Sequence, residues 1–138
     1  MTVFVLDNSV TMRWCFESGA HAYADSVLER LEADDGQAFV PIIWRYEVSA
    51  VLARAQNTGV LTAQRVAECL QDLQDLNITI DADSGSRILT QVHQLAVTHR
   101  LTTYDAAYLE LALRTDLPLA TLDVALLRAC KIAGAPVL

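Results

Sequence analysis

Residues 2–10 read TVFVLDNSV, an apolar segment that ends at an acidic residue and leads into helix-like sequence. This composition predicts a β-strand over residues 2–6 that is covered on both faces, as strands of parallel sheets are. An acid placed directly after such a strand lies at the carboxyl edge of the sheet, where α/β proteins bind their ligands. The stretch therefore predicts both the class of fold and the position of a site.

Short apolar strands and amphipathic helices alternate along the rest of the chain. Further strands are predicted at residues 37–40, 77–80 and 118–121, with a short edge strand at 136–138. Helices are predicted at residues 9–16, 20–33, 42–56, from 62 onward, 84–99, 102–114 and 124–133. Strands that alternate with helices indicate an α/β fold with a parallel sheet. A length of 138 residues without a linker or repeat predicts a single domain over residues 1–138.

The composition, with 53% hydrophobic and 20% charged residues, is that of a compact globular protein. No apolar run approaches the roughly 20 residues of a membrane helix, and the first residues do not resemble a signal peptide, so we expect a cytoplasmic protein without a membrane segment. The net charge of −7 argues against a general nucleic-acid binder, because phosphate binding relies on clustered Lys and Arg. Nucleic-acid chemistry would then need a local positive group such as a bound metal, and an acidic surface suits a basic protein partner.

The cysteines and histidines do not form a recognisable site. The three cysteines are odd in number and lack C-x-x-C spacing, which predicts buried free thiols and neither a disulfide framework nor a zinc site. They are Cys15, Cys69 and Cys130. The histidines are scattered, and we expect them at the surface or at helix ends: His21, His93 and His99.

Four acids lie in apolar stretches, whereas most of the other acids lie in polar contexts. They are Asp7 in VFVLDNSV, Glu47 in IIWRYEVSAVLA, Asp105 in TTYDAAYLELA and Asp123 in LATLDVALL. A buried carboxylate is costly unless it is paired, hydrogen-bonded or bound to a cation. Helix capping is the alternative explanation for the three aspartates. Asp7 and Asp123 precede predicted helices as N-caps do, and Asp105 with Thr102 fits a capping box.

Capping does not explain Glu47, which lies inside a predicted helix beside apolar positions. An ion pair with Arg54, seven residues further along, is the alternative there. Two carboxylates about 5 Å apart repel by roughly 3 kcal/mol at an effective dielectric near 20, so four together need a cation to stay ionised. Oxygen ligands suit Mg²⁺ or Mn²⁺, which can activate a water and neutralise charge on a phosphodiester.

The segments around these acids also resemble a known family. They are VLDNSV at 5–10, VPIIWRYEVSAVLARA at 40–55, LTTYDAAYLELA at 101–112 and LATLDVALLRAC at 119–130. In order and spacing they are similar to the acidic motifs of PIN-domain ribonucleases, particularly the VapC-type toxins of bacterial toxin–antitoxin modules. The resemblance implies a three-layer α/β/α sandwich around a central parallel β-sheet. It also implies RNA cleavage that depends on Mg²⁺ or Mn²⁺, a homodimer and a small antitoxin partner.

By the same resemblance, Asp7 and Asp105 are expected to be metal ligands, and Asp123 completes or water-bridges the site. Glu47 would bind the metal directly or orient the attacking water. The expected reaction is hydrolysis of an RNA phosphodiester by a metal-activated water, which leaves a 5′-phosphate and a 3′-hydroxyl. A catalytically silent PIN-like protein- or RNA-binding module is the alternative.

Supporting residues are also implied by the resemblance. Ser9 and Thr121 match small hydroxyl residues that hold the carboxylates two positions away. Many relatives carry a basic residue directly after the last acid, where this chain has Val124. Phosphate contacts would then fall to arginines elsewhere: Arg13, Arg100 and Arg128. An apolar groove for the antitoxin is expected, and its candidate lining residues, with plain core as the alternative, are Trp14, Trp44 and Tyr46.

Overall fold

A parallel β-sheet forms the centre of the protein, for which the computed structural model describes residues 2–16 and 21–138. The strands are β1 (Thr2–Leu6), β2 (Gly36–Val40), β3 (Ile78–Ile80) and β4 (Leu119–Ala120), in the order β3-β2-β1-β4. Phe4, Val5 and Leu6 of β1 are fully buried, which confirms that this strand is covered on both faces.

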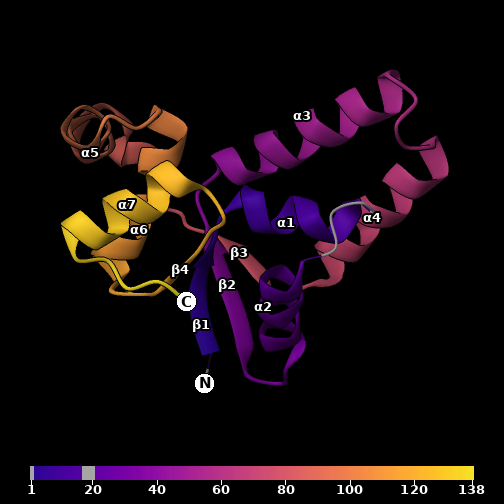
Figure 1. Ribbon diagram of the computed structural model, residues 1–138, viewed down its shortest axis with the longest axis horizontal. Helices are drawn as coiled ribbons and strands as arrows, with labels where there is room; N and C mark the ends of the chain where they lie inside the picture. The colour runs from indigo at the N-terminus through magenta and orange to yellow at the C-terminus, as the bar shows by residue number, and fades with distance from the viewer. Residues whose placement is uncertain (1, 17–20) are drawn as a thin grey trace.

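Helices cover both faces of the sheet, so the prediction of a three-layer α/β/α sandwich is confirmed. Figure 1 shows α6 and α7 on one side of the sheet and α1, α2 and α4 on the other, with α3 extending away from its upper edge. The bounds are α1 (Asn8–Cys15), α2 (Ala22–Glu32), α3 (Ile43–Asn57), α4 (Ala63–Asp75), α5 (His93–His99), α6 (Thr103–Thr115) and α7 (Val124–Ala133). The start of the helix predicted at 20–33 falls partly on residues outside the described ranges.

Two predicted elements differ from the structure. The helix predicted over 84–99 is divided into a 3₁₀ turn (Gly85–Arg87), a π-helical turn (Ile88–Val92) and α5. A π-turn inserts an extra residue into the helical repeat without requiring Gly or Pro, so apolar spacing does not reveal it. The predicted edge strand at 136–138 is reduced to one parallel bridge between Leu119 and Val137.

The strand order places a topological switch beside β1. The chain moves from β1 to β2 on one side and later adds β4 on the other side of β1. The connections of an open α/β sheet diverge at such a point and leave a crevice at the carboxyl ends of the strands. The end of β1 and the end of β4 therefore form the expected position of a site.

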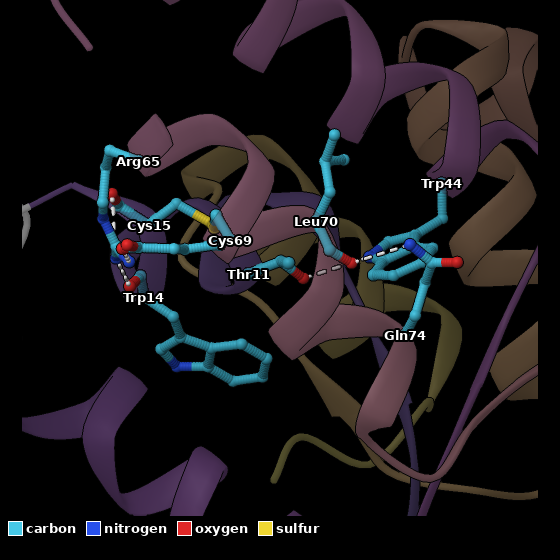
Figure 2. The surroundings of a disulfide bond; sticks show 9 residues. Thr11, Trp14, Cys15, Trp44, Arg65, Cys69, Leu70 and Gln74 are labelled. Carbon is cyan, nitrogen blue, oxygen red and sulfur yellow. Dashed lines mark hydrogen bonds and ion pairs between the residues drawn. A yellow bond between two sulfur atoms is a disulfide. The ribbon is translucent and has the colours of Figure 1, made fainter. Parts of the chain in front are cut away.

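A disulfide joins Cys15, at the end of α1, to Cys69 in α4, with the two Cα atoms 5.9 Å apart (Figure 2). The prediction of free thiols is therefore wrong for this pair. The two cysteines are 54 residues apart in sequence, and only the packing of the layer brings them together. Cys130 is a buried free thiol, as predicted, and its pKa is raised by burial and by Asp7 to about 11. Within the described ranges no helix is long and apolar enough to cross a membrane.

Candidate active site at the switch point

Asp7 is the most buried of the four predicted site acids, with 3% of its surface exposed. It follows β1, and its backbone N–H donates to the carbonyl of Ala120 in β4 at 3.0 Å. The extended φ and ψ of −81° and 146° at Asp7 end the strand and allow α1 to begin at the next residue. Asp7 occupies the N-cap position of α1, but its side chain does not make the capping hydrogen bond. Capping of α1 therefore does not account for the position of the Asp7 carboxylate.

Two hydroxyl groups hold the carboxylate of Asp7. Ser9 Oγ donates to Asp7 Oδ2 at 2.6 Å, and Thr121 Oγ1 donates to the same oxygen at 2.7 Å. Thr121 Oγ1 in turn accepts from the backbone N–H of Asp123 at 3.0 Å, and Ser9 Oγ accepts from the N–H of Leu122 at 3.0 Å. Ser9 thus binds the carboxylate two positions away, as the motifs predict, but Thr121 binds the carboxylate of Asp7 and not that of Asp123. Both fix Asp7, whereas Asp123 is bound by Thr121 through its backbone only.

Asp123 and Asp105 both lie at helix starts, as the capping alternative requires. Asp123 Oδ1 accepts from the N–H of Leu126 at 2.8 Å and caps α7. Asp105 lies in the first turn of α6, where its own N–H donates to the Thr102 hydroxyl at 3.1 Å. These hydrogen bonds explain why Asp123 and Asp105 lie at the starts of α7 and α6. They do not neutralise their charge, so capping and a role in the site are compatible.

Glu47 lies in the second turn of α3 and is partly buried. The hydroxyl of Tyr108 in α6 donates to Glu47 Oε1 at 2.7 Å. Arg54 is exposed and makes no ion pair with Glu47, so the ion-pair alternative is not supported. Tyr108 was missed at the sequence level, although its position three residues after Asp105 places both side chains on neighbouring parts of one helix face.

The four acids interact electrostatically. Burial, followed by the charge of Asp123, raises the pKa of Asp7 above its ordinary value, even though Ser9 and Thr121 lower it. Burial raises the pKa of Glu47, and the charges of Asp7 and Asp105 raise it further. Burial, Asp123 and Asp7 together raise the pKa of Asp105 to about 6. Each raised pKa means that the charged form is disfavoured in the folded chain.

The sequence of the chain matches a known domain family. Residues 4–132 match the PIN domain. The chain belongs to the PIN domain family. The resemblance noted in the four acidic segments is thereby confirmed over nearly the whole sequence.

Individual relatives of this PIN domain are similar over different shares of its length. Ribonuclease VapC3 of Pyrobaculum aerophilum is 32% identical over 78 residues, which cover 56% of this chain and 60% of that protein. The chain thus spans about 60% of that relative's length.

Two solved structures have the same fold. PAE2754 of Pyrobaculum aerophilum superposes with a TM-score of 0.61 at 19% identity, covering 93% of this chain and 84% of that one. FitAcB of Neisseria gonorrhoeae gives a TM-score of 0.62 at 18% identity, covering 95% and 94%.

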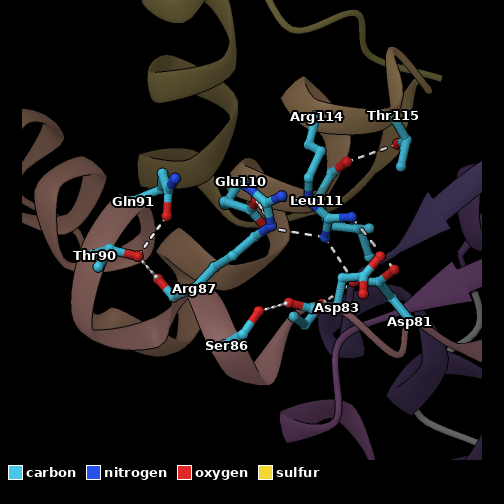
Figure 3. Close-up of polar contacts among 11 residues, drawn as sticks. Asp81, Asp83, Ser86, Arg87, Thr90, Gln91, Glu110, Leu111, Arg114 and Thr115 are labelled. Atoms are coloured by element: carbon cyan, nitrogen blue, oxygen red, sulfur yellow. Dashed lines mark hydrogen bonds and ion pairs between the residues drawn. The ribbon is translucent and has the colours of Figure 1, made fainter.

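Within the described part of this PIN domain the site acids lack a cationic partner, whereas Asp81 and Glu110 have one. Figure 3 shows Arg114 between two carboxylates, with Nη2 2.6 Å from Asp81 Oδ2 and Nε 2.7 Å from Glu110 Oε1. Glu110 is only 4% exposed and also pairs with Arg87 at 3.6 Å. Burial opposes ionisation of Asp81, yet Arg114 and Ser84 bring its pKa below the ordinary value. Within the described ranges, Asp7, Glu47, Asp105 and Asp123 form no ion pair with Lys, Arg or His.

The charges of Asp7, Asp105 and Asp123 raise the pKa of neighbouring site acids, but the acids of the described chain are not gathered into a preformed set of metal ligands. Among residues 2–16 and 21–138, no three His, Cys, Asp or Glu side chains are grouped so that they could hold a metal ion. The donor chemistry still fits a hard divalent cation, because every acidic group offers carboxylate oxygens and the cluster lacks positive charge. A cation that keeps several waters needs few direct protein ligands.

The residues considered for contacts with RNA or the antitoxin lie partly at the surface and partly in the core. Val124 is 78% exposed at the start of α7, and Arg13 is exposed on α1. Tyr46 is 70% exposed, whereas Trp14 and Trp44 pack against the core. Trp44 also borders a groove between α3, α4 and β3. Its lining is mixed, with apolar Val48, Leu70, Leu73, Leu76, Ile78 and Ile80 beside polar Arg45, Ser49 and Gln74. Of the three aromatic residues proposed for a groove, only Trp44 lines this one.

Proposed function

We propose that this PIN domain is an endoribonuclease that hydrolyses RNA phosphodiester bonds with Mg²⁺ or Mn²⁺. The observation that carries the proposal is the cluster of four acids at the switch point. Burial and neighbouring acidic charges raise the pKa values of Asp7, Glu47 and Asp105, and none of the four has a cationic partner in the described chain. Unpaired buried carboxylates are costly to maintain. A bound cation offsets that cost, and the ribonuclease name of the 32%-identical relative supports RNA as the substrate.

Each acid would have a role in metal binding or proton transfer that suits its surroundings. Asp7 and Asp105 would hold the ion, and Asp123 would complete the site while it caps α7. The hydroxyls of Ser9 and Thr121 fix the orientation of Asp7. When bound, Mg²⁺ or Mn²⁺ supplies an acidified water and neutralises charge that develops on the phosphate. Glu47, which accepts a hydrogen bond from Tyr108, would accept a proton from the attacking water or bind the ion.

Cleavage of a labelled single-stranded RNA in the presence of Mg²⁺ or Mn²⁺ tests the proposal. Wild type should cleave, EDTA should stop cleavage, and Asp7→Asn and Asp105→Asn should each reduce the rate at least a hundredfold. Asp83→Asn is a matched control, because Asp83 is an exposed acid near the same edge of the sheet and should keep the wild-type rate. Equal rates for all four proteins, or cleavage that survives EDTA, would refute the assignment.

A catalytically silent binding module is the second candidate, and one observation favours it. No three ligands are gathered into a ready metal site within the described residues. Titration calorimetry with Mn²⁺ separates the two functions. The nuclease should bind Mn²⁺, and Asp7→Asn should abolish the heat of binding. A silent module should give no heat of binding in either protein.

We further propose a cytoplasmic, single-domain toxin that forms a homodimer and binds a small antitoxin. The groove beside Trp44, whose lining is part apolar and part polar, suits an amphipathic segment of the antitoxin. Exposed apolar side chains near α5 and α7 suit a contact with a second copy, namely Leu89, Val97, Val124 and Ile132. Light scattering of the purified chain measures the dimer. Co-purification with the product of a neighbouring small reading frame, and its loss in Leu70→Glu, tests the groove.

A further inference from the structure

A hollow between the end of α5 and the outer face of α7 carries positive charge in an otherwise acidic protein. The residues that line it, here called the basic hollow, are Thr98, His99, Arg100, Arg128, Ala129 and Ile132. Both arginines are exposed, and neither makes a side-chain hydrogen bond or ion pair with a described residue. By contrast, Arg87 and Arg114 are each paired with Glu110. With a net charge of −7, two unpaired arginines in one hollow leave their positive charge available to a ligand.

The backbone at Arg100 gives a second, independent observation. Arg100 follows α5 in the left-handed conformation, with φ 53° and ψ 44°. Helices that end in this way usually have Gly or Asn at that position, because a Cβ is strained there. The chain instead keeps a long cationic side chain at this point. A non-glycine residue with positive φ is uncommon, and among the described residues Asp116 is the only other one.

Both arginines of the basic hollow lie near site acids along the chain. Arg100 lies two residues before Thr102, the N-cap of α6, whose first turn carries Asp105. Arg128 lies on α7, whose N-cap is Asp123. Five residues of α-helix rise about 7.5 Å, so Arg128 lies about a turn and a half beyond Asp123 along α7. Each arginine is thus five residues along the chain from one of the four acids.

We propose that the basic hollow is a phosphate subsite that binds the backbone of a single-stranded RNA beside the bond to be cleaved. This inference rests on the proposed nuclease function and adds to it where the substrate strand lies. An acidic cluster repels a polyanion, so the strand needs cationic contacts outside the cluster. Arginines that contact phosphates position a strand without selecting its bases. The subsite should therefore add affinity for longer strands of any sequence.

Binding of a fluorescein-labelled twelve-nucleotide single-stranded RNA tests the subsite. The measurement is made in EDTA and in the Asp105→Asn background, so that cleavage is absent, and it is repeated from low to high NaCl. Adding Arg100→Gly and Arg128→Ala should weaken binding at least tenfold at low salt. Each neutralised phosphate of a single strand contributes about 0.7 to the slope of log K against log salt. Loss of two contacts should therefore flatten the slope by about 1.4.

Matched variants separate loss of a contact from damage to the fold. Gly suits a left-handed backbone, so Arg100→Gly should melt at or above the parent temperature. Asp116→Gly repeats this exchange at the other described non-glycine residue with positive φ, 55°, and should leave binding unchanged. Arg54→Ala removes an exposed cation from the far end of α3 and should also leave the slope unchanged. An equal slope in the double variant and the parent, or no binding by the parent at any salt concentration, would overturn the subsite.

A cleavage assay with Mg²⁺ then distinguishes failure of the subsite from failure of the proposed function. If wild type cleaves, the double variant should have a raised KM for the twelve-nucleotide RNA and an unchanged kcat, and it should lose the advantage of long over very short substrates. Wild-type kinetics in the double variant would overturn the subsite and leave the nuclease intact. Salt-dependent binding that requires both arginines, in a chain that never cleaves, would retain the subsite and refute the nuclease.

Discussion

Replacing Asp105 by Asn should make the metal-free protein more stable while it removes activity. Asp105 is partly buried at the start of α6, where burial and the charges of Asp123 and Asp7 raise its pKa from 3.8 to about 6. The folded chain therefore carries a cost whenever this carboxylate is ionised. Asn has nearly the same shape and no charge. The variant should thus be relieved of that cost without leaving a cavity.

The expected gain in the free energy of unfolding follows from the raised pKa of Asp105. A change from 3.8 to about 6 corresponds to roughly 3 kcal/mol, since each factor of ten is worth about 1.4 kcal/mol. Asp105 is only half buried, so solvent screening reduces the expected gain to about 1–2 kcal/mol. Because the folded pKa lies above the unfolded one, the cost is absent below about pH 4 and grows as the pH rises toward 6. At pH 5 the gain should be about half of its value at pH 7.5.

Urea unfolding in EDTA at pH 5 and pH 7.5 measures this gain. Asp105→Asn should raise the free energy of unfolding by about 1–2 kcal/mol at pH 7.5, and by less at pH 5. Asp83→Asn, an exposed acid, should change it by less than about 0.5 kcal/mol at either pH. A destabilised Asp105→Asn protein, or a gain that does not depend on pH, would refute the electrostatic reasoning.

Three other predictions concern contacts of single residues. Tyr108→Phe should shift the acidic limb of the pH–rate profile upward, because the Tyr108 hydrogen bond lowers the pKa of Glu47; an unshifted limb would contradict this role. Arg114→Met should cost about 3 kcal/mol in urea unfolding, because Glu110 and Asp81 lose their main cation, and a loss below about 1 kcal/mol would show that water replaces it. Dithiothreitol should lower the unfolding free energy by about 2–4 kcal/mol through the Cys15–Cys69 bond, and it should have no effect on Cys15→Ser.

The central strand was predictable because its burial on both faces requires a continuous run of apolar residues. The apolar run at residues 2–6 identifies β1, and the acid after it identifies the carboxyl edge of the sheet. The interruption of the helix predicted at 84–99 was not predictable, since Ile88–Val92 forms its π-turn without Gly or Pro. The disulfide was not predictable either. Cys15 and Cys69 meet only through tertiary packing, and nothing in their spacing indicates it.

The sequence proposes the residues of the candidate site, but it does not reveal the hydrogen-bond partners that the structure gives them. The apolar surroundings of Asp7 identify it, and Ser9 binds its carboxylate as the motifs predict, whereas Thr121 also binds Asp7 and not the carboxylate of Asp123. The hydrogen-bond partner of Glu47 was not found, because Tyr108 lies on another helix and is 61 residues away in sequence. Glu110 was overlooked, although Arg114 four residues later is a local signal of its pairing.

The cost of the acidic cluster also predicts how stability responds to metal. Any ion that binds only the folded chain stabilises it by about 2.7 kcal/mol when its concentration is a hundred times the Kd. That exceeds the 1–2 kcal/mol that Asp105→Asn gains by losing a charge, and the variant should lose most of its affinity for the ion. The order of stability should therefore reverse: Asp105→Asn is the more stable protein in EDTA, and wild type is the more stable one in saturating Mn²⁺. If Asp105→Asn has the higher free energy of unfolding in both solutions, the acids repel one another but do not bind a cation.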